Sequence, residues 1–115
     1  MRKIDFYRDK SGYCPVEEFL DSLNAKQAQK VVWVLRLIEE QETVPNTYLK
    51  KLINTEEIWE VRVQFGNNIF RILGFFENYN LIVLTSGFQK KSQKTPEKEI
   101  QLAEKRRKDY LKPRR

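Results

Sequence analysis

Two spacings of apolar residues divide the chain into stretches that favour helix and stretches that favour strand. Between residues 25 and 42 the apolar side chains recur at helical spacing and form a broad face, which predicts a buried helix. Between residues 58 and 64 apolar and polar side chains alternate, which predicts a strand with one buried face and one polar face. The polar face of that strand carries Glu60, Arg62 and Gln64.

Turn-forming and helix-capping residues set the limits of the other predicted elements. Asn24 is suited to be the N-cap of the helix that follows it. Gly66 and Asn67 suit a tight hairpin turn, because both residue types accept positive φ. Thr95 and Pro96 are predicted to start the last helix as its N-cap and first-turn proline. The remaining elements are predicted as strands at 4–8, 69–76 and 81–86 and as helices at 15–23 and 96–111.

The predicted order of elements is β-α-α-β-β-β-α, which indicates an α+β fold. With 115 residues the whole chain, 1–115, is expected to form a single domain, because one hydrophobic core normally serves about 100–200 residues. The first two helices are joined almost without a linker and are expected to form a hairpin on one face of a twisted, mainly antiparallel sheet. The other face is then open, or covered in part by the last helix, and is a candidate binding surface.

The residue types present limit the chemistry that is available. The chain has no histidine and one cysteine, Cys14, which excludes the usual Cys/His zinc site and every histidine-based ribonuclease mechanism. Catalysis must therefore use Lys, Arg, Glu, Asp, Tyr, Ser or Thr, and we expect no metal and no cofactor. No apolar run is long enough to span a membrane and no secretory leader is visible, so a cytoplasmic protein that does not contact membranes is expected.

Positive charge is concentrated in the second part of the chain. The net charge is +6. Residues 1–48 hold seven Lys and Arg against eight Asp and Glu, whereas residues 49–115 hold fifteen against eight. Such an imbalance favours a surface that binds a polyanion on one side of the molecule. The charge alone is equally compatible with a protein that is simply basic.

Two arginines are predicted to face each other in the first hairpin. If Gly66 and Asn67 form the loop, counting back places Arg62 directly opposite Arg71. Like charges side by side on a sheet are destabilising, and a bound phosphate would relieve the repulsion through bidentate hydrogen bonds to guanidinium groups. Two alternatives stay open: Glu60 forms a surface salt bridge with Arg71, or a turn one residue later separates the arginines.

Lysines flank the predicted strands at both ends of the hairpin region. Lys50 and Lys51 precede the first hairpin strand, and Lys90 and Lys91 follow the last strand, and we expect the four to converge at one end of the sheet. Clustered cations lower one another's pKa, which suits a lysine for proton transfer near neutral pH. Phe88 precedes the second pair; it is placed either to stack on an RNA base or to pack into the core.

The stretch IWEVRVQFGNNIFRILGFFENYNLIVLTSGFQKKSQKTPEKEIQLAEKR carries a family resemblance. Its W/E/R strand, its FRIL strand and its ending of the form GFxKKxxKTPxxEIxxA resemble HigB toxins of the RelE/ParE superfamily, including their phage-derived relatives. The resemblance covers residues 49–111, and the helical hairpin before them fits the same plan. It implies the toxin of a type II toxin–antitoxin system: a metal-independent endoribonuclease that cleaves mRNA on the ribosome and inhibits translation. The implied partners are mRNA, the ribosome and a helix-turn-helix antitoxin of the HigA type.

The resemblance also implies a role for each motif residue. Arg71 would stabilise the scissile phosphate, with Arg62 and Lys51 helping to hold it. Lys90 or Lys91 would transfer a proton or bind a flanking phosphate. The residues implied in substrate binding are Lys50, Phe88, Glu60 and Lys94, of which Phe88 would stack on a base and Glu60 would orient an arginine.

Two other functions remain open at this stage. A ParE-like protein of the same fold would inhibit DNA gyrase by binding, without catalysis. A nucleic-acid-binding protein without toxicity would use the same basic surface. Arg71 with the four lysines favours the nuclease over the gyrase inhibitor, whereas only growth arrest on induction, abolished by Arg71→Ala, would exclude the non-toxic protein.

Overall fold

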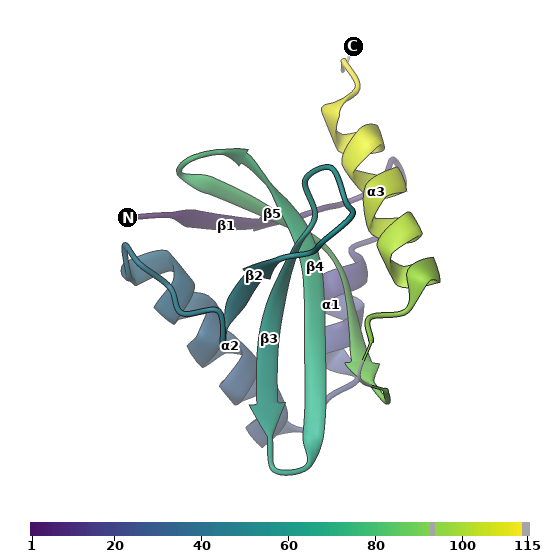
Figure 1. Cartoon of the computed structure of the whole chain (residues 1–115). Helices are drawn as coiled ribbons and strands as arrows, with labels where there is room; N and C mark the ends of the chain where they lie inside the picture. Colours follow the sequence, from purple (N-terminus) through teal and green to yellow (C-terminus); the bar gives the residue numbers. More distant parts are fainter. Residues whose placement is uncertain (93, 114–115) are drawn as a thin grey trace.

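Figure 1 shows the computed structural model, which describes residues 1–92 and 94–113. These residues form one five-stranded sheet and three helices, which confirms the predicted α+β class. The elements are β1 (Lys3–Phe6), α1 (Pro15–Asp21), α2 (Ala25–Glu40), β2 (Leu49–Lys51), β3 (Trp59–Phe65), β4 (Asn68–Asn78), β5 (Leu81–Lys90) and α3 (Glu97–Leu111). The short strand β2 was not predicted, because three residues are too few to show an alternating pattern.

The strands lie in the order β1-β5-β4-β3-β2, with β1 parallel to β5 and the other neighbours antiparallel. The sheet is therefore mainly antiparallel, as predicted. Phe65 pairs with Asn68, which confirms the turn at Gly66 and Asn67, and Gly66 has the positive φ of 60° that the turn requires. A bulge after Leu73 shifts the register between β4 and β5.

Alternate residues of the strands face two different layers. One set packs against α1 and α2 and forms the main core, which includes Val34 and Ile38 from α2 and Phe70 and Ile72 from β4. The capping box that Asn24 forms with Gln27 fixes the start of α2. The two helices thus cover one face of the sheet, as expected.

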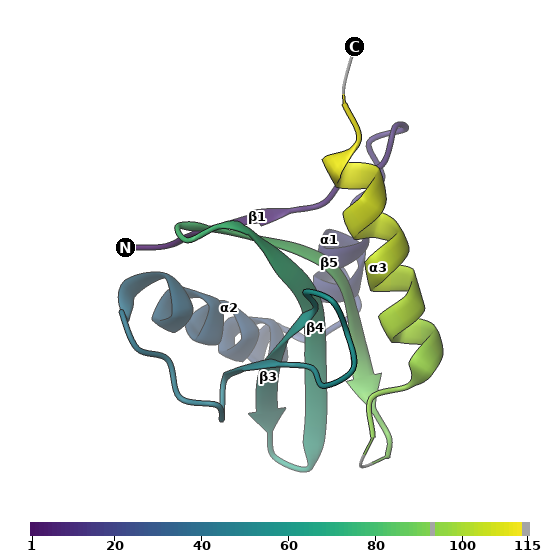
Figure 2. The same ribbon diagram turned by 45° about the horizontal axis from the view of Figure 1, so that its top comes forward.

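The last helix lies on the opposite face. Ala103 of α3 packs against Leu73 of β4, and Phe75 of the same strand packs against Tyr110. Figures 1 and 2 show α3 beside β5 and β4, away from α2. The face above β3 and the first part of β4 is consequently left to polar side chains, and it holds the candidate site.

Strand β5 is longer than predicted and includes Gly87, Phe88, Gln89 and Lys90. These residues were expected to follow the strand, because the apolar run that predicted it ends at residue 86. They continue the ladder instead: Phe88 pairs with Arg71, and Lys90 pairs with Ile69.

Candidate functional site

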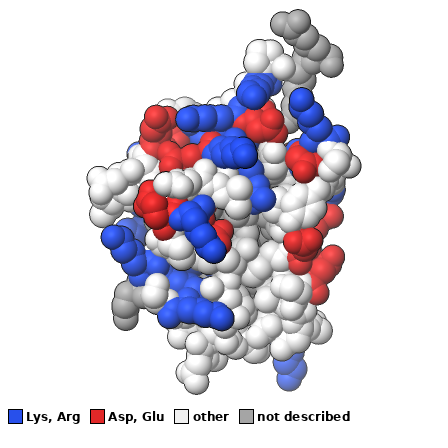
Figure 3. All heavy atoms as spheres, turned by 90° about the vertical axis from the view of Figure 1, so that its right-hand side faces the viewer, with Lys and Arg blue, Asp and Glu red and all other residues white. Residues whose placement is uncertain are grey.

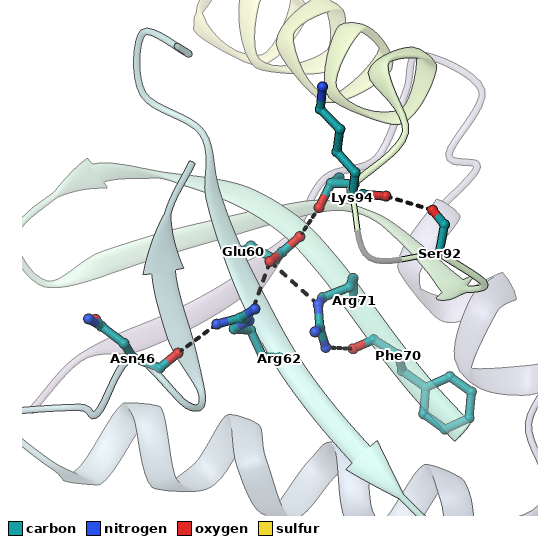
Figure 4. A network of polar contacts seen from close by, with 8 residues as sticks. Asn46, Glu60, Arg62, Phe70, Arg71, Ser92 and Lys94 are labelled. Carbon is teal, nitrogen blue, oxygen red and sulfur yellow. Dashed lines mark hydrogen bonds and ion pairs between the residues drawn. The ribbon is translucent and has the colours of Figure 1, made fainter. Parts of the chain in front are cut away.

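A buried carboxylate lies between the two predicted arginines. Arg62 and Arg71 are paired across β3 and β4, as the sequence predicted. The Oε1 atom of Glu60 lies 3.5 Å from Nε of Arg62 and 3.4 Å from Nε of Arg71 (Figure 4). Glu60 is only 2% exposed. The alternative in which Glu60 pairs with Arg71 is therefore also correct, although the pair is buried and not a surface salt bridge.

The second oxygen of Glu60 is held by Thr95. The Thr95 hydroxyl donates a hydrogen bond of 2.5 Å to Oε2. The prediction that Thr95 caps the last helix is wrong: Pro96 occupies the N-cap position and no side chain caps α3. A hydrogen bond to a buried carboxylate is stronger than one to a backbone amide, which explains why the hydroxyl points at Glu60. We call Glu60, Arg62, Arg71 and Thr95 the clamp.

Arg71 is the more buried arginine of the clamp, with 8% exposure. One of its terminal nitrogens donates to the Phe70 carbonyl at 3.1 Å. Burial lowers the pKa of Arg71; the Arg62 charge also lowers it, while Glu60 opposes both. The guanidinium stays charged, because arginine begins from a pKa above 12. The clamp therefore contains two guanidinium charges and one carboxylate charge. One positive charge remains uncompensated.

A hollow of about 480 Å³ opens beside the clamp, and we call it the clamp hollow. Glu60 and Arg62 form part of its wall, and lysines surround it. The lining lysines are Lys50, Lys51, Lys90 and Lys94. Burial lowers the pKa of Lys90, and the neighbouring charge of Arg71 lowers it further. Lys90 is thus closer than a free lysine to losing its proton near neutral pH.

The lysines reach this hollow by a different route from the one predicted. Strands β3 and β5 run in the same direction, so Lys50, opposite Glu60, and Lys90, level with Gln64 across β4, do not share one end of the sheet. The offset is four residues of β3, or roughly 13 Å at strand spacing. Their long side chains close that distance, together with the segment that carries Lys94.

The structure separates the members of each predicted lysine pair. Lys50 pairs with Glu60 and shares its face, whereas Lys51 pairs with Trp59, on the alternate position of β2. Both border the hollow, but Lys50 is the one aimed along the face of the clamp. Lys90 lines the hollow, whereas Lys91 is exposed beyond the end of β5 and is absent from the described lining.

Phe88 occupies the position next to Arg71 on β5. It is half-buried and packs against the cluster of Ile58, Leu73 and Ala103 under α3. The packing alternative of the sequence analysis is therefore realised for most of the ring. The ring remains partly exposed, and its pairing with Arg71 places it on the same face of the sheet.

Charge on this side of the molecule is more mixed than the sequence suggested. Figure 3 shows Asp and Glu among the Lys and Arg side chains on the α3 side. The positive excess is concentrated around the clamp hollow, where the described ionisable lining comprises one arginine and four lysines against Glu60 and Glu97. Among the described residues no group of three or more His, Cys, Asp and Glu is placed to hold a metal ion. The arrangement is suited to binding a phosphate.

Thr95 and the loop before β2 were missed as parts of the site. Thr95 was interpreted as a helix cap because Thr followed by Pro is typical of a helix start. Asn46 lies in a loop without regular pattern, yet its carbonyl oxygen is 3.4 Å from a terminal nitrogen of Arg62. Nothing in the sequence pairs a threonine or a loop carbonyl with a distant strand.

Residues 18–108 match the family described as Phage derived protein Gp49-like (DUF891). The chain belongs to this Gp49-like family. The match extends from α1 through most of α3 and includes every residue of the clamp. The family is associated with toxin–antitoxin-like phage proteins, so this Gp49-like protein is toxin-like and an antitoxin partner is implied. A search of the curated proteins found no match.

In the described parts of the chain no helix is both long and apolar enough to cross a bilayer.

Proposed function

We propose that this Gp49-like protein is the toxin of a type II toxin–antitoxin pair, of the HigB type, and acts as an endoribonuclease on mRNA at the ribosome. The whole chain would act as one toxin domain in the cytoplasm and be neutralised by a helix-turn-helix antitoxin. The observation that carries the proposal is the clamp: two facing arginines share one buried carboxylate beside a hollow lined by lysines.

The clamp fits the charge changes of RNA cleavage. The 2′-hydroxyl would attack the adjacent phosphorus, the bond to the 5′-oxygen would break, and the products would be a 2′,3′-cyclic phosphate and a 5′-hydroxyl end. Arg71 and Arg62 would bind the non-bridging oxygens, on which negative charge increases in the transition state. This chemistry transfers one proton from the attacking oxygen to a base and one from an acid to the leaving oxygen.

Lys90 suits proton transfer better than Glu60. Both oxygens of Glu60 are engaged, one by the two arginines and one by Thr95, so neither oxygen is free to accept the proton of a 2′-hydroxyl. Lys90 has a lowered pKa and lines the hollow beside Arg62. Lys50, Lys51 and Lys94 would bind flanking phosphates, Phe88 would contact a base, and Lys91 would contribute from outside the hollow.

The test is cleavage of a defined mRNA by the purified protein, with and without ribosomes. We expect cuts that end in 2′,3′-cyclic phosphate and that continue in EDTA. Arg71→Ala should lower the single-turnover rate by about 100-fold or more. The matched control is Arg8→Ala, which removes an arginine from an exposed pair with Glu17. Growth arrest on induction should be lost with Arg71→Ala and kept with Arg8→Ala.

A gyrase assay run in parallel separates this proposal from the ParE-like alternative. Inhibition of DNA supercoiling without mRNA cleavage would contradict the nuclease and favour the gyrase inhibitor. Binding of RNA without cleavage or growth arrest would favour a non-toxic nucleic-acid-binding protein.

A further inference from the structure

A second hollow lies at the free edge of β3, and we call it the edge hollow. Its volume is about 540 Å³. Strand β2 pairs with β3 only from Trp59 to Val61, so the later part of β3 has no strand beside it on that side. The hollow occupies this edge, between the loop before β2 and α2. Its lining residues are Lys30, Asn46, Thr47, Tyr48, Arg62, Val63, Gln64 and Arg71.

The edge hollow and the clamp hollow meet at Arg62. Arg62 lines both, and Arg71 lines the edge hollow. In Figure 4, Arg62 lies between Glu60 on one side and Asn46 on the other. The Nε atoms of both arginines are buried and make no hydrogen bond within the described residues. A phosphate bound by the two guanidinium groups would therefore have one hollow on each side of it.

Aromatic side chains stand at the α2 side of the edge hollow. Tyr48 lines it, and the Trp33 ring contacts Tyr48 edge to face, with 5.9 Å between ring centroids. Trp33 is 50% exposed, which is high for the largest apolar side chain. The Lys30 ammonium lies 4.9 Å from the Trp33 ring centroid and also lines the hollow. A cation, two aromatic rings and the amides of Asn46 and Gln64 thus lie together.

This combination of groups is suited to a nucleotide. Aromatic rings stack on bases, cations bind phosphates, and side-chain amides form hydrogen bonds with base edges. An acidic peptide would use the cations but would leave the exposed face of Trp33 and the amide groups with less to bind. The continuity with the arginines favours an RNA strand, since successive phosphates of one strand would occupy both hollows.

We propose that the edge hollow binds the nucleotide next to the scissile phosphate. Tyr48 and Trp33 form its stacking platform, and Lys30 binds the adjoining phosphate. The inference rests on the proposed nuclease function, because only that function makes the phosphate held by the arginines the one that is cleaved. The binding is tested separately at Lys30, Trp33 and Tyr48, which take no part in the proposed chemistry.

Trp33 provides a direct measurement. The chain has two tryptophans, and Trp59→Phe leaves Trp33 as the sole indole while keeping an aromatic ring against Phe76. This variant is titrated with a single-stranded oligonucleotide in which every ribose is 2′-deoxy, which cannot be cleaved by 2′-hydroxyl attack. We expect quenching of the Trp33 fluorescence on binding, with an affinity that falls as salt rises.

Substitutions in the same background then test each residue. Tyr48→Ala should weaken binding about tenfold or more, and Tyr48→Phe should restore it. Lys30→Gln should weaken binding at low salt. It should also reduce by about one the slope of the logarithm of the affinity against the logarithm of the salt concentration. Lys30→Arg should restore both the affinity and this slope. The matched control is Lys3→Gln, which makes the same change on β1 at the opposite edge of the sheet and should leave affinity and slope unchanged.

The outcomes separate this inference from the proposed function. If the protein cleaves mRNA but Lys30→Gln and Tyr48→Ala bind like Lys3→Gln, the edge hollow is not a nucleotide site. Absence of any Trp33 quenching in the parent variant also overturns the inference. If Trp33 reports binding with the expected dependence on Lys30 and Tyr48 but no RNA is cleaved, the edge hollow stands and the nuclease function fails.

Discussion

The carboxylate of Glu60 and the guanidinium of Arg71 form an ion pair that is almost closed to water. Their side chains are 3% and 10% exposed, and Oε1 lies 3.4 Å from Nε. Removing two charges from water costs several kcal/mol per ion, and their attraction offsets that cost only with good geometry and additional hydrogen bonds. Here the Nε atoms of both arginines lack a hydrogen bond within the described structure. Glu60 therefore contacts both guanidinium groups at ion-pair distance without satisfying the hydrogen-bonding capacity of either Nε.

Glu60→Gln should destabilise the fold, because it leaves two facing guanidinium groups without a countercharge. Breaking a buried ion pair by removing one partner typically costs about 3 kcal/mol or more. Urea unfolding measures the change, with the exposed Glu57→Gln as the control for loss of the same charge. Inorganic phosphate should stabilise Glu60→Gln more than the unchanged protein. Equal stability of the two variants would show that Glu60 does not hold the arginines.

Thr95→Val should lower stability by about 1 to 3 kcal/mol, since it removes a hydrogen bond to a charged group. Thr95→Ser keeps the hydroxyl and should lose less. A double-mutant cycle with Glu60→Gln identifies the partner. If the hydroxyl acts on Glu60, the two losses are not additive. Additive losses would instead favour the helix-capping role that the sequence suggested.

Lys90→Gln should abolish cleavage and at the same time raise stability at neutral pH. Burial and Arg71 lower the pKa of Lys90 in the folded state, so the charged lysine disfavours folding below that pKa. Between the folded and unfolded pKa values the unfolded chain binds more protons, and stability rises with pH. Thermal unfolding at several pH values checks this: the advantage of Lys90→Gln should shrink as pH rises through the pKa of Lys90. An advantage that grows with pH would contradict it.

The pH dependence of cleavage tests Lys90 as the base. Its lowered pKa predicts a rate that rises with pH and levels off below the range of a free lysine. Lys90→Arg keeps the charge but should lose this rising limb, because arginine does not deprotonate in that range. A limb unchanged in Lys90→Arg would assign the proton transfer to another group.

Tyr7→Phe should destabilise the contact between the segment after β1 and α3 by about 1 to 2 kcal/mol. The Tyr7 hydroxyl donates a 2.6 Å hydrogen bond to Asp109, and burial, followed by that bond, raises the pKa of Tyr7 to about 12. Because the folded pKa is raised above 10.0, the stabilisation is complete below pH 10 and is lost as pH rises towards 12. Unfolding midpoints from pH 9 to 12 should converge for the two proteins. If the midpoints of the two proteins instead kept a constant difference across this pH range, the raised pKa of Tyr7 would be contradicted.

Local patterns predicted the parts of the fold that local forces determine. The capping box at Asn24, the alternation around Val61 and the turn at Gly66 all depend on residues within a few positions of one another, and the structure confirms them. The register that places Arg62 opposite Arg71 follows from the turn, so it could be counted from the sequence.

The features that could not be predicted from the sequence depend on contacts between residues that lie far apart along the chain. The length of β5 follows from pairing with β4 across a bulge, and polar residues such as Gln89 do not signal it. The burial of Glu60 depends on Thr95, which is remote in sequence and was assigned to a helix cap. Lys50, Lys51 and Lys90 line one hollow although they do not share one end of the sheet, so the predicted grouping was right for these three lysines while its geometry was wrong.

The parallel pairing of β1 with β5 has a consequence for synthesis of the chain. β1 leaves the ribosome first, but its neighbour in the sheet is the last strand to emerge. The arginine hairpin of β3 and β4 can form earlier, because its contacts are local. Lys90 and Thr95 emerge only after both strands of that hairpin. A chain released before these residues would carry the two arginines but neither the lysine nor the hydroxyl that surrounds them in the folded protein.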